Sequence, residues 1–198
     1  MTNFTNPTRL IACDSKLVVI DVQARLLPVI QDHQSVAATI RFLLDTAEIM
    51  QVPAVLTEQY PKGLGPTVEL LRNHAATFTT IEKIRFSAAD ELLKDGVTAN
   101  QIVLAGIESH ICVQQTALEL QSRGLQVLIA ADGIGSRHAE DSCRAMDRMD
   151  RAGIVISTAE AIAFEWCERA GTERFKALSR LVRERDVARA GDVSSNTS

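Results

Sequence analysis

The chain has 198 residues, of which 46% are hydrophobic and 23% charged, and its formal net charge is −4. This length and composition suit a globular protein with a single core. The longest apolar runs are too short to span a membrane, and basic residues do not interleave with aromatic ones, so we expect no membrane and no nucleic acid as partners. The amino terminus lacks a signal-peptide pattern, which indicates a cytoplasmic protein.

The first half of the chain alternates strand and helix patterns. A β-branched run at 17–20 predicts a strand buried on both faces, and apolar residues at helical spacing predict a helix over 36–50. Pro53 ends that helix and opens a strand at 54–57. A loop rich in Gly and Pro over 59–66 then leads to three predicted elements: a short helix at 67–72, a strand at 78–81 and a helix at 88–94.

The second half continues the same alternation. We expect a strand at 101–105 that Gly106 breaks, a helix at 111–123 and a strand at 126–131 that ends at Asp132. A helix at 140–152 and a strand at 154–156 follow, and Ser157 with Glu160 forms a capping-box pattern for the next helix. The last amphipathic helix is predicted at 173–185, followed by a polar, flexible tail at 186–198.

Six repeats of this alternation predict an α/β fold: a three-layer α/β/α sandwich around a doubly wound, six-stranded parallel sheet. No linker or repeat divides the chain, so we expect one domain over residues 1–198. In such folds ligands bind at the carboxyl ends of the strands. Residues at those ends are therefore the first candidates for a functional site.

Three reactive side chains follow the first, third and fourth predicted strands: Asp21, Lys83 and Cys112. A thiolate is a far better nucleophile than a thiol, and both a helix N-terminus and a nearby lysine stabilise it. Asp21 is suited to take the thiol proton as general base. A turn at Gly106 can aim backbone N–H groups at a developing oxyanion.

Each of these residues also has a purely structural interpretation. Asp21 can be a turn former, Lys83 a solvated loop residue, and Cys112 a small apolar side chain beneath its helix. The four cysteines lie far apart in sequence and form no C-x-x-C pair, which predicts four free thiols at Cys13, Cys112, Cys143 and Cys167.

Three stretches, 18–23, 82–87 and 105–113, resemble the signature stretches of isochorismatase-like cysteine hydrolases, in the same order along the chain. Nicotinamidases and N-carbamoylsarcosine amidases belong to that superfamily. The segment TEQYPKGLGPT at 57–67 is similar to the isochorismatase domain-containing protein branch. The resemblance extends from about residue 17 to residue 185.

The resemblance implies a role for each residue. Cys112 is then the nucleophile, Asp21 the base and Lys83 the electrostatic partner of both. It also implies a cis peptide between Ile107 and Glu108, with the N–H groups of Glu108 and Cys112 forming the oxyanion hole.

Nicotinamidases carry an Asp-x-His metal motif after the second strand, and this chain departs from it. The corresponding stretch, 57–60, contains no histidine, and the four histidines are scattered without ligand spacing. We therefore expect no metal and no other cofactor. A retained Cys112 favours acyl chemistry, which leads to the hypothesis of a metal-independent cysteine hydrolase that cleaves an amide-type C–N bond of a small molecule through a thioester.

A catalytically weak scaffold or binding protein of the same fold is the alternative function. Six residues beside the three reactive ones are candidates for the substrate pocket: Gln23, Glu58, Gln59, Tyr60, Phe86 and Ile111. The late helix with Ile162, Phe164 and Trp166 is too apolar to face solvent all round, which predicts a homo-oligomer.

Overall fold

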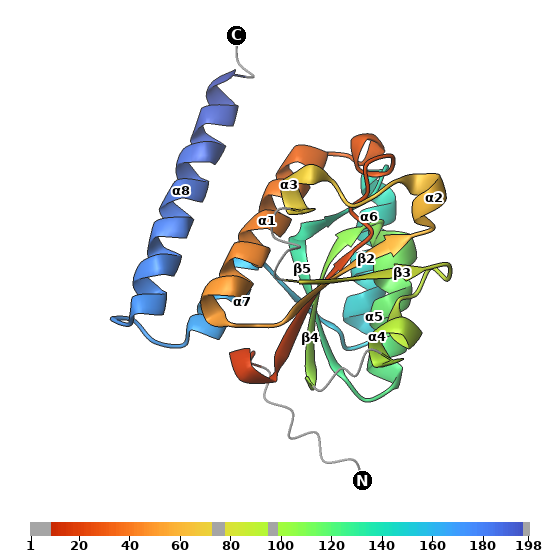
Figure 1. Cartoon of the computed structure of the whole chain (residues 1–198), viewed down its shortest axis with the longest axis horizontal. Helices are drawn as coiled ribbons and strands as arrows, with labels where there is room; N and C mark the ends of the chain where they lie inside the picture. Colours follow the sequence, from red (N-terminus) through yellow and green to blue (C-terminus); the bar gives the residue numbers. More distant parts are fainter. Residues whose placement is uncertain (1–8, 73–77, 95–98, 196–198) are drawn as a thin grey trace.

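The computed structural model describes residues 9–72, 78–94 and 99–195. Six strands form one parallel sheet in the order β3-β2-β1-β4-β5-β6 (Figure 1). The strands are β1 (Ser15–Ile20), β2 (Ala54–Gln59), β3 (Thr79–Lys83), β4 (Gln101–Ile107), β5 (Gln126–Gly135) and β6 (Val155–Ser157). The strand order reverses between β1 and β4, which is where doubly wound sheets open a binding crevice.

Helices cover both faces of this sheet (Figure 1). One face carries α1 (His33–Met50), α3 (Glu69–Arg72) and α7 (Ala159–Cys167), and the other carries α4 (Ala89–Lys94), α5 (Gln114–Ser122) and α6 (Ala139–Arg151). The final helix, α8 (Glu173–Ser195), packs on the outer side of α1 and α7. Shorter turns are η1 (Ala12–Asp14), η2 (Leu27–Val29), α2 (Pro61–Leu64) and η3 (Ser109–Val113). The predicted three-layer sandwich with a six-stranded parallel sheet is confirmed. Its assignment to one domain over 1–198 stays a prediction.

The strands divide the core into two clusters. In β4, Val103 and Ala105 point to the side of α1, whereas Ile102 and Leu104 point to the side of α5. This alternation buries both faces of the central strands, as their continuous apolar runs predict. Burial of each large aliphatic side chain stabilises the fold by about 1.5–3 kcal/mol, so the two clusters hold the strand ends in fixed positions.

The final helix is longer than its sequence pattern indicated. We expected it to end near residue 185 with a flexible tail behind it, but α8 continues to Ser195; residues 196–198 lie outside the described residues. Arg185 ties α8 to the body: its guanidinium donates to Asp132 at 2.9 Å and to Thr39 at 3.1 Å, and it stacks 4.4 Å from the centroid of the Phe42 ring.

Three local predictions were wrong. β5 does not end at Asp132 but continues to Gly135, paired with β4. The N-cap of α7 is Thr158, whose hydroxyl accepts from the Ala161 N–H at 3.4 Å, and not Ser157. The loop expected at 59–66 contains the single turn α2.

Among the described residues, no helix is both long and apolar enough to cross a membrane.

β3 is one of the two edge strands of the sheet, and within the described residues its one partner is β2. Thr79, Thr80 and Glu82 are exposed, whereas Lys83, its last residue, is buried. The strand therefore presents a solvated edge and turns a single polar residue inward.

Gly106 of β4 pairs in register with Ile20 of β1. Its φ is +119°, and a Cβ at this position would overlap the backbone of Ile20, the residue just before Asp21. A backbone neighbour cannot rotate away as a side chain can, so only glycine fits here. Gly124 also has a positive φ, +89°, but a Cβ there would meet open space.

We predict that Gly106→Ala lowers the free energy of unfolding by about 3 kcal/mol or more, because it adds a backbone overlap to the strain of a positive φ. Gly124→Ala carries only the conformational strain and should cost about 1 kcal/mol. Urea denaturation of the two variants measures both values. Equal losses of unfolding free energy in the two variants would show that β1 leaves room for a side chain at residue 106.

Candidate active site

Asp21 and Lys83 form a buried ion pair at the carboxyl edge of the sheet. Asp21 directly follows β1 in a left-handed conformation, with φ +51°, and Lys83 ends β3. Both side chains are fully buried, and the Lys83 Nζ lies 2.6 Å from the Asp21 Oδ2. β2 lies between β1 and β3 in the sheet, so this ion pair joins the ends of β1 and β3 across the end of β2.

Further hydrogen bonds saturate both charges. The Thr57 hydroxyl donates to the Asp21 Oδ1 at 2.7 Å. The ammonium of Lys83 also donates to the Gln59 Oε1 at 2.7 Å and to the carbonyls of Phe86 at 2.9 Å and Arg85 at 3.2 Å. Buried charges are tolerated only when they are paired and hydrogen-bonded in this way.

The Cys112 thiol lies close enough to this pair for the charges of both Asp21 and Lys83 to act on its pKa. Cys112 lies in η3, a π-helical turn between β4 and α5, and is 5% exposed. Burial raises the pKa of the thiol to about 12; the Asp21 charge adds to the increase and the Lys83 charge opposes it. The sequence pattern indicated groups that stabilise a thiolate, but in the structure burial and the Asp21 charge outweigh them. At neutral pH the thiol keeps its proton beside the carboxylate.

The peptide bond between Ile107 and Glu108 is cis. The Glu108 carbonyl accepts from the N–H groups of Ile111 at 3.1 Å and Val113 at 3.2 Å, which joins the end of β4 to η3. Its carboxylate accepts from the backbone N–H and the Nε of Arg137, at 3.0 and 3.1 Å. Glu108 is therefore fixed both through its main-chain carbonyl, which bonds to η3, and through its side chain, which bonds to Arg137.

Thr116 links the helix that follows Cys112 to the loop after Lys83. Its hydroxyl, which is fully buried, donates to the Cys112 carbonyl at 2.7 Å and accepts from the Ala88 N–H at 3.0 Å. Thr57, Thr116 and the Arg137–Glu108 pair were not predicted from the sequence. A hydroxyl at the end of the otherwise apolar run 54–57 was a usable signal for Thr57, whereas the other contacts join segments distant in sequence.

The six pocket candidates fall into two groups. Gln23 and Gln59 are buried, and their side-chain amides bond to other residues of the protein; Glu58 accepts from the N–H and the hydroxyl of Thr67, at 2.7 and 2.8 Å. The other three reach the surface to different degrees: Tyr60 is 52% and Phe86 54% exposed, and Ile111 is partly buried.

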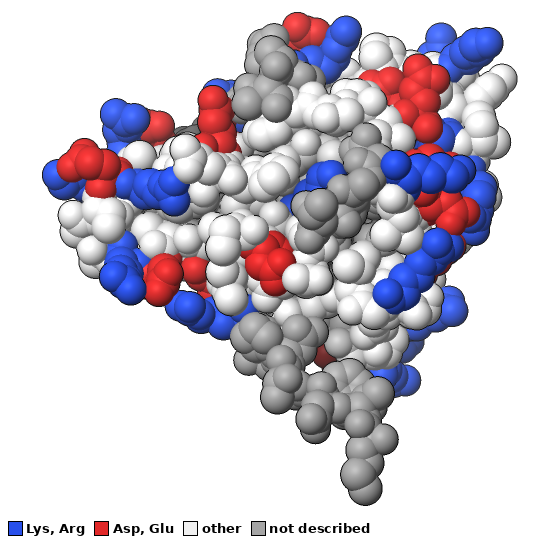
Figure 2. Space-filling view, turned by 60° about the horizontal axis from the view of Figure 1, so that its bottom comes forward, with Lys and Arg blue, Asp and Glu red and all other residues white. Residues whose placement is uncertain are grey.

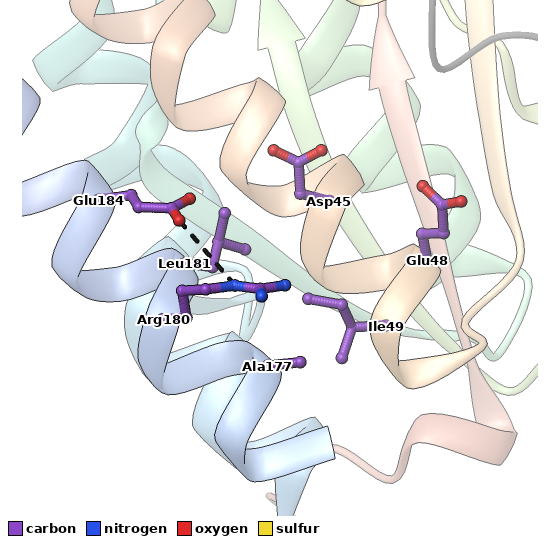
Figure 3. A pocket seen from close by; sticks show the side chains of 7 residues that line it. All are labelled: Asp45, Glu48, Ile49, Ala177, Arg180, Leu181 and Glu184. Carbon is purple, nitrogen blue, oxygen red and sulfur yellow. Dashed lines mark ion pairs between the residues drawn. The ribbon is translucent and has the colours of Figure 1, made fainter. Parts of the chain in front are cut away.

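A groove between α1 and α8 lies away from these residues (Figure 3). Arg180 extends from α8 toward α1 and pairs with Glu184 at 3.9 Å, and Asp45 and Glu48 line the α1 side. The groove contains none of the predicted site residues.

In the part of the chain that the structure describes, no group of three or more His, Cys, Asp or Glu side chains could hold a metal ion.

Comparison with known proteins places the chain among relatives of the same domain type. Residues 15–161 match the isochorismatase domain. Isochorismatase domain-containing protein 1 of Salmo salar is 33% identical over 186 residues, which cover 92% of this chain and 65% of the salmon protein. Isochorismatase domain-containing protein 2 of Bos taurus is 36% identical over 179 residues, covering 89% and 86%. The chain therefore spans about two-thirds of the first relative and most of the second.

Solved structures agree with this assignment. A structure titled as the MAR1 ribonuclease from Caenorhabditis elegans has a TM-score of 0.84 and 33% identity, covering 88% of this chain and 92% of that one. The YcaC gene product of Escherichia coli, titled as an octameric hydrolase of unknown specificity, has a TM-score of 0.83 at 23% identity, covering 94% and 98%, and shares the fold. The chain belongs to the isochorismatase domain family.

Proposed function

We propose that this protein is a metal-independent cysteine hydrolase that cleaves an amide-type C–N bond of a small molecule. One observation carries the proposal: at the carboxyl edge of the sheet, the Cys112 thiol lies beside a buried ion pair, near enough for the Asp21 carboxylate and the Lys83 ammonium both to act on its pKa. Nucleophile, base and countercharge are the three groups that thiol-dependent acyl transfer requires. We assign these roles to Cys112, Asp21 and Lys83.

In the first half of the reaction, the Cys112 sulfur attacks the substrate carbonyl while its proton passes to Asp21. The C–N bond then breaks, the amine leaves with the proton returned from Asp21, and a thioester remains on Cys112. The high pKa of the resting thiol makes this proton transfer necessary, because few molecules hold a thiolate at neutral pH.

In the second half, Asp21 takes a proton from water, whose oxygen attacks the thioester carbonyl. The C–S bond breaks, the carboxylic acid leaves, and the proton returns to the Cys112 sulfur. Both tetrahedral intermediates carry an oxyanion, which we assign to the backbone N–H groups of Glu108 and Cys112. The positive charge of Lys83 lowers the energy of each negatively charged species in this cycle.

Tyr60, Phe86 and Ile111 are the substrate-contact candidates that their surroundings favour, because their side chains are not committed to polar contacts within the fold. A small-molecule substrate fits better than a nucleic acid. The net charge is −4, and on the face shown in Figure 2 acidic and basic side chains are interspersed rather than gathered into a basic stripe.

The scaffold alternative retains the fold without turnover. The hydrogen bonds that saturate Asp21 and Lys83 argue against it, because a buried ion pair adds little stability over apolar residues of similar size. An arrangement that is costly to bury and is placed around a thiol is better explained by catalysis.

The first prediction separates the two roles of Asp21. Asp21→Asn removes a charge that raises the pKa of Cys112, so alkylation of Cys112 by iodoacetamide at pH 8 should accelerate about tenfold, since one pKa unit is a factor of ten. Turnover should fall by about 10²-fold or more, because the base is lost. Both rates are measured in a background with serine at Cys13, Cys143 and Cys167. Slower alkylation would contradict the assigned electrostatics.

The second prediction concerns the intermediate. With a slowly hydrolysed substrate from a panel of aliphatic and aromatic amides, intact-mass spectrometry should find the acyl group on Cys112, before and after treatment with EDTA. Cys112→Ala should remove turnover, whereas Cys143→Ala, at an exposed position, should keep it. An adduct on another cysteine, or full activity in Cys112→Ala, would show that the nucleophile is misassigned.

We also propose that the chain forms a homo-oligomer. Of the three apolar residues that suggested this, Ile162 and Trp166 are buried within the chain, and Phe164 is 41% exposed. The shared fold of an octameric hydrolase is consistent with assembly. Light scattering should give a multiple of the 21.6 kDa chain mass; a value equal to the chain mass at micromolar concentration would refute the proposal.

A further inference from the structure

The side-chain amide of Gln59 is held at both ends. Gln59 ends β2 and pairs in register with Lys83 of β3. Its Oε1 accepts from the Lys83 Nζ at 2.7 Å, and its Nε2 donates to the Ile84 carbonyl at 2.7 Å. A rotated amide would set its NH₂ group against the ammonium and its oxygen against the carbonyl, so these two partners determine its orientation.

Gln23 holds the backbone of Gln59 in turn. This side chain is buried; its Oε1 accepts from the Gln59 N–H at 2.8 Å, and its Nε2 donates to the Gln59 carbonyl at 3.0 Å and to the Gly65 carbonyl at 2.6 Å. Gln59 is therefore fixed through its main chain and its side chain. With its oxygen committed to Lys83, it is suited to orient that ammonium rather than to contact a substrate.

We propose that Gln59 is a positioning residue that holds the Lys83 ammonium toward Asp21 and Cys112 while adding no charge to the site. This inference deepens the proposed function, because it assumes that Lys83 acts on the Cys112 thiol. A glutamate of the same length would also accept from Lys83. It would, however, place a second carboxylate beside the pair, and the negative charge that develops on the sulfur and on the oxyanion would then be opposed.

The test measures the rate at which iodoacetamide alkylates Cys112 between pH 6 and pH 9, in the background with serine at the other three cysteines. Gln59→Glu should slow alkylation at pH 8 by about tenfold or more, because its charge raises the pKa of the thiol by about one unit. Gln59→Met, which loses one of the four acceptors of Lys83 but adds no charge, should slow it by about threefold. Gln51→Glu adds the same charge at the exposed end of α1 and should leave the rate unchanged.

A double-mutant cycle shows whether Gln59 acts through the lysine. In a Lys83→Met background, Gln59→Met should change the alkylation rate by less than about 1.5-fold, because the ammonium that it positions is absent. If Gln59→Met slowed alkylation as much in the Lys83→Met background as in the parent protein, the proposal would be overturned. So would unchanged rates in both Gln59 variants.

Circular dichroism and thermal melting establish that each variant is folded. If Gln59→Glu does not fold, Gln59→Met and the cycle decide the question; failure of both to fold would assign Gln59 to the fold and contradict the positioning role. Alkylation does not require turnover, so the two proposals can fail separately. A parent protein that hydrolyses no amide but shows the expected alkylation rates would contradict the hydrolase alone.

Discussion

The burial of two opposite charges at the end of the sheet is the constraint that organises this protein. A carboxylate and an ammonium lose several kcal/mol of hydration each when they leave water, and their mutual attraction compensates only if the remaining donors and acceptors are also used. Here a threonine hydroxyl, a glutamine oxygen and two carbonyls of the following loop supply those bonds. The loop after β3 and the end of β2 are shaped around this pair, and the thiol is placed against it.

The fold and the place of the site could be predicted from the sequence because both depend on regular patterns. Continuous apolar strands alternating with amphipathic helices leave few topologies other than a doubly wound sheet. In that sheet the carboxyl ends of β1, β3 and β4 lie along one edge, which is why Asp21, Lys83 and Cys112 were candidates for one site. Element boundaries were less predictable: β5 and α8 continue beyond their local stop signals because pairing and packing with distant segments extend them.

The chemistry of the site depended on contacts that no local pattern encodes. The balance between burial, Asp21 and Lys83 at the Cys112 thiol is set by their separation in three dimensions, and sequence reasoning weighed the lysine and the helix too heavily. Likewise, Gln23 and Gln59 looked like pocket residues because they follow strand ends, and only their hydrogen-bond partners reveal that they face the protein. Position along a strand predicts which edge a residue reaches, but not whether its polar atoms remain available.

The location of Lys83 on an edge strand has a consequence for how the proposed activity responds to heating. Most of β3 is solvated, and it has one neighbour, so opening of this edge exposes little apolar surface and costs less free energy than unfolding of the central strands. Such an opening withdraws the ammonium from the site while β1 and β4 stay paired. Loss of the proposed activity is then a local event, and amide hydrogen exchange in β3 should report it before any global transition is visible.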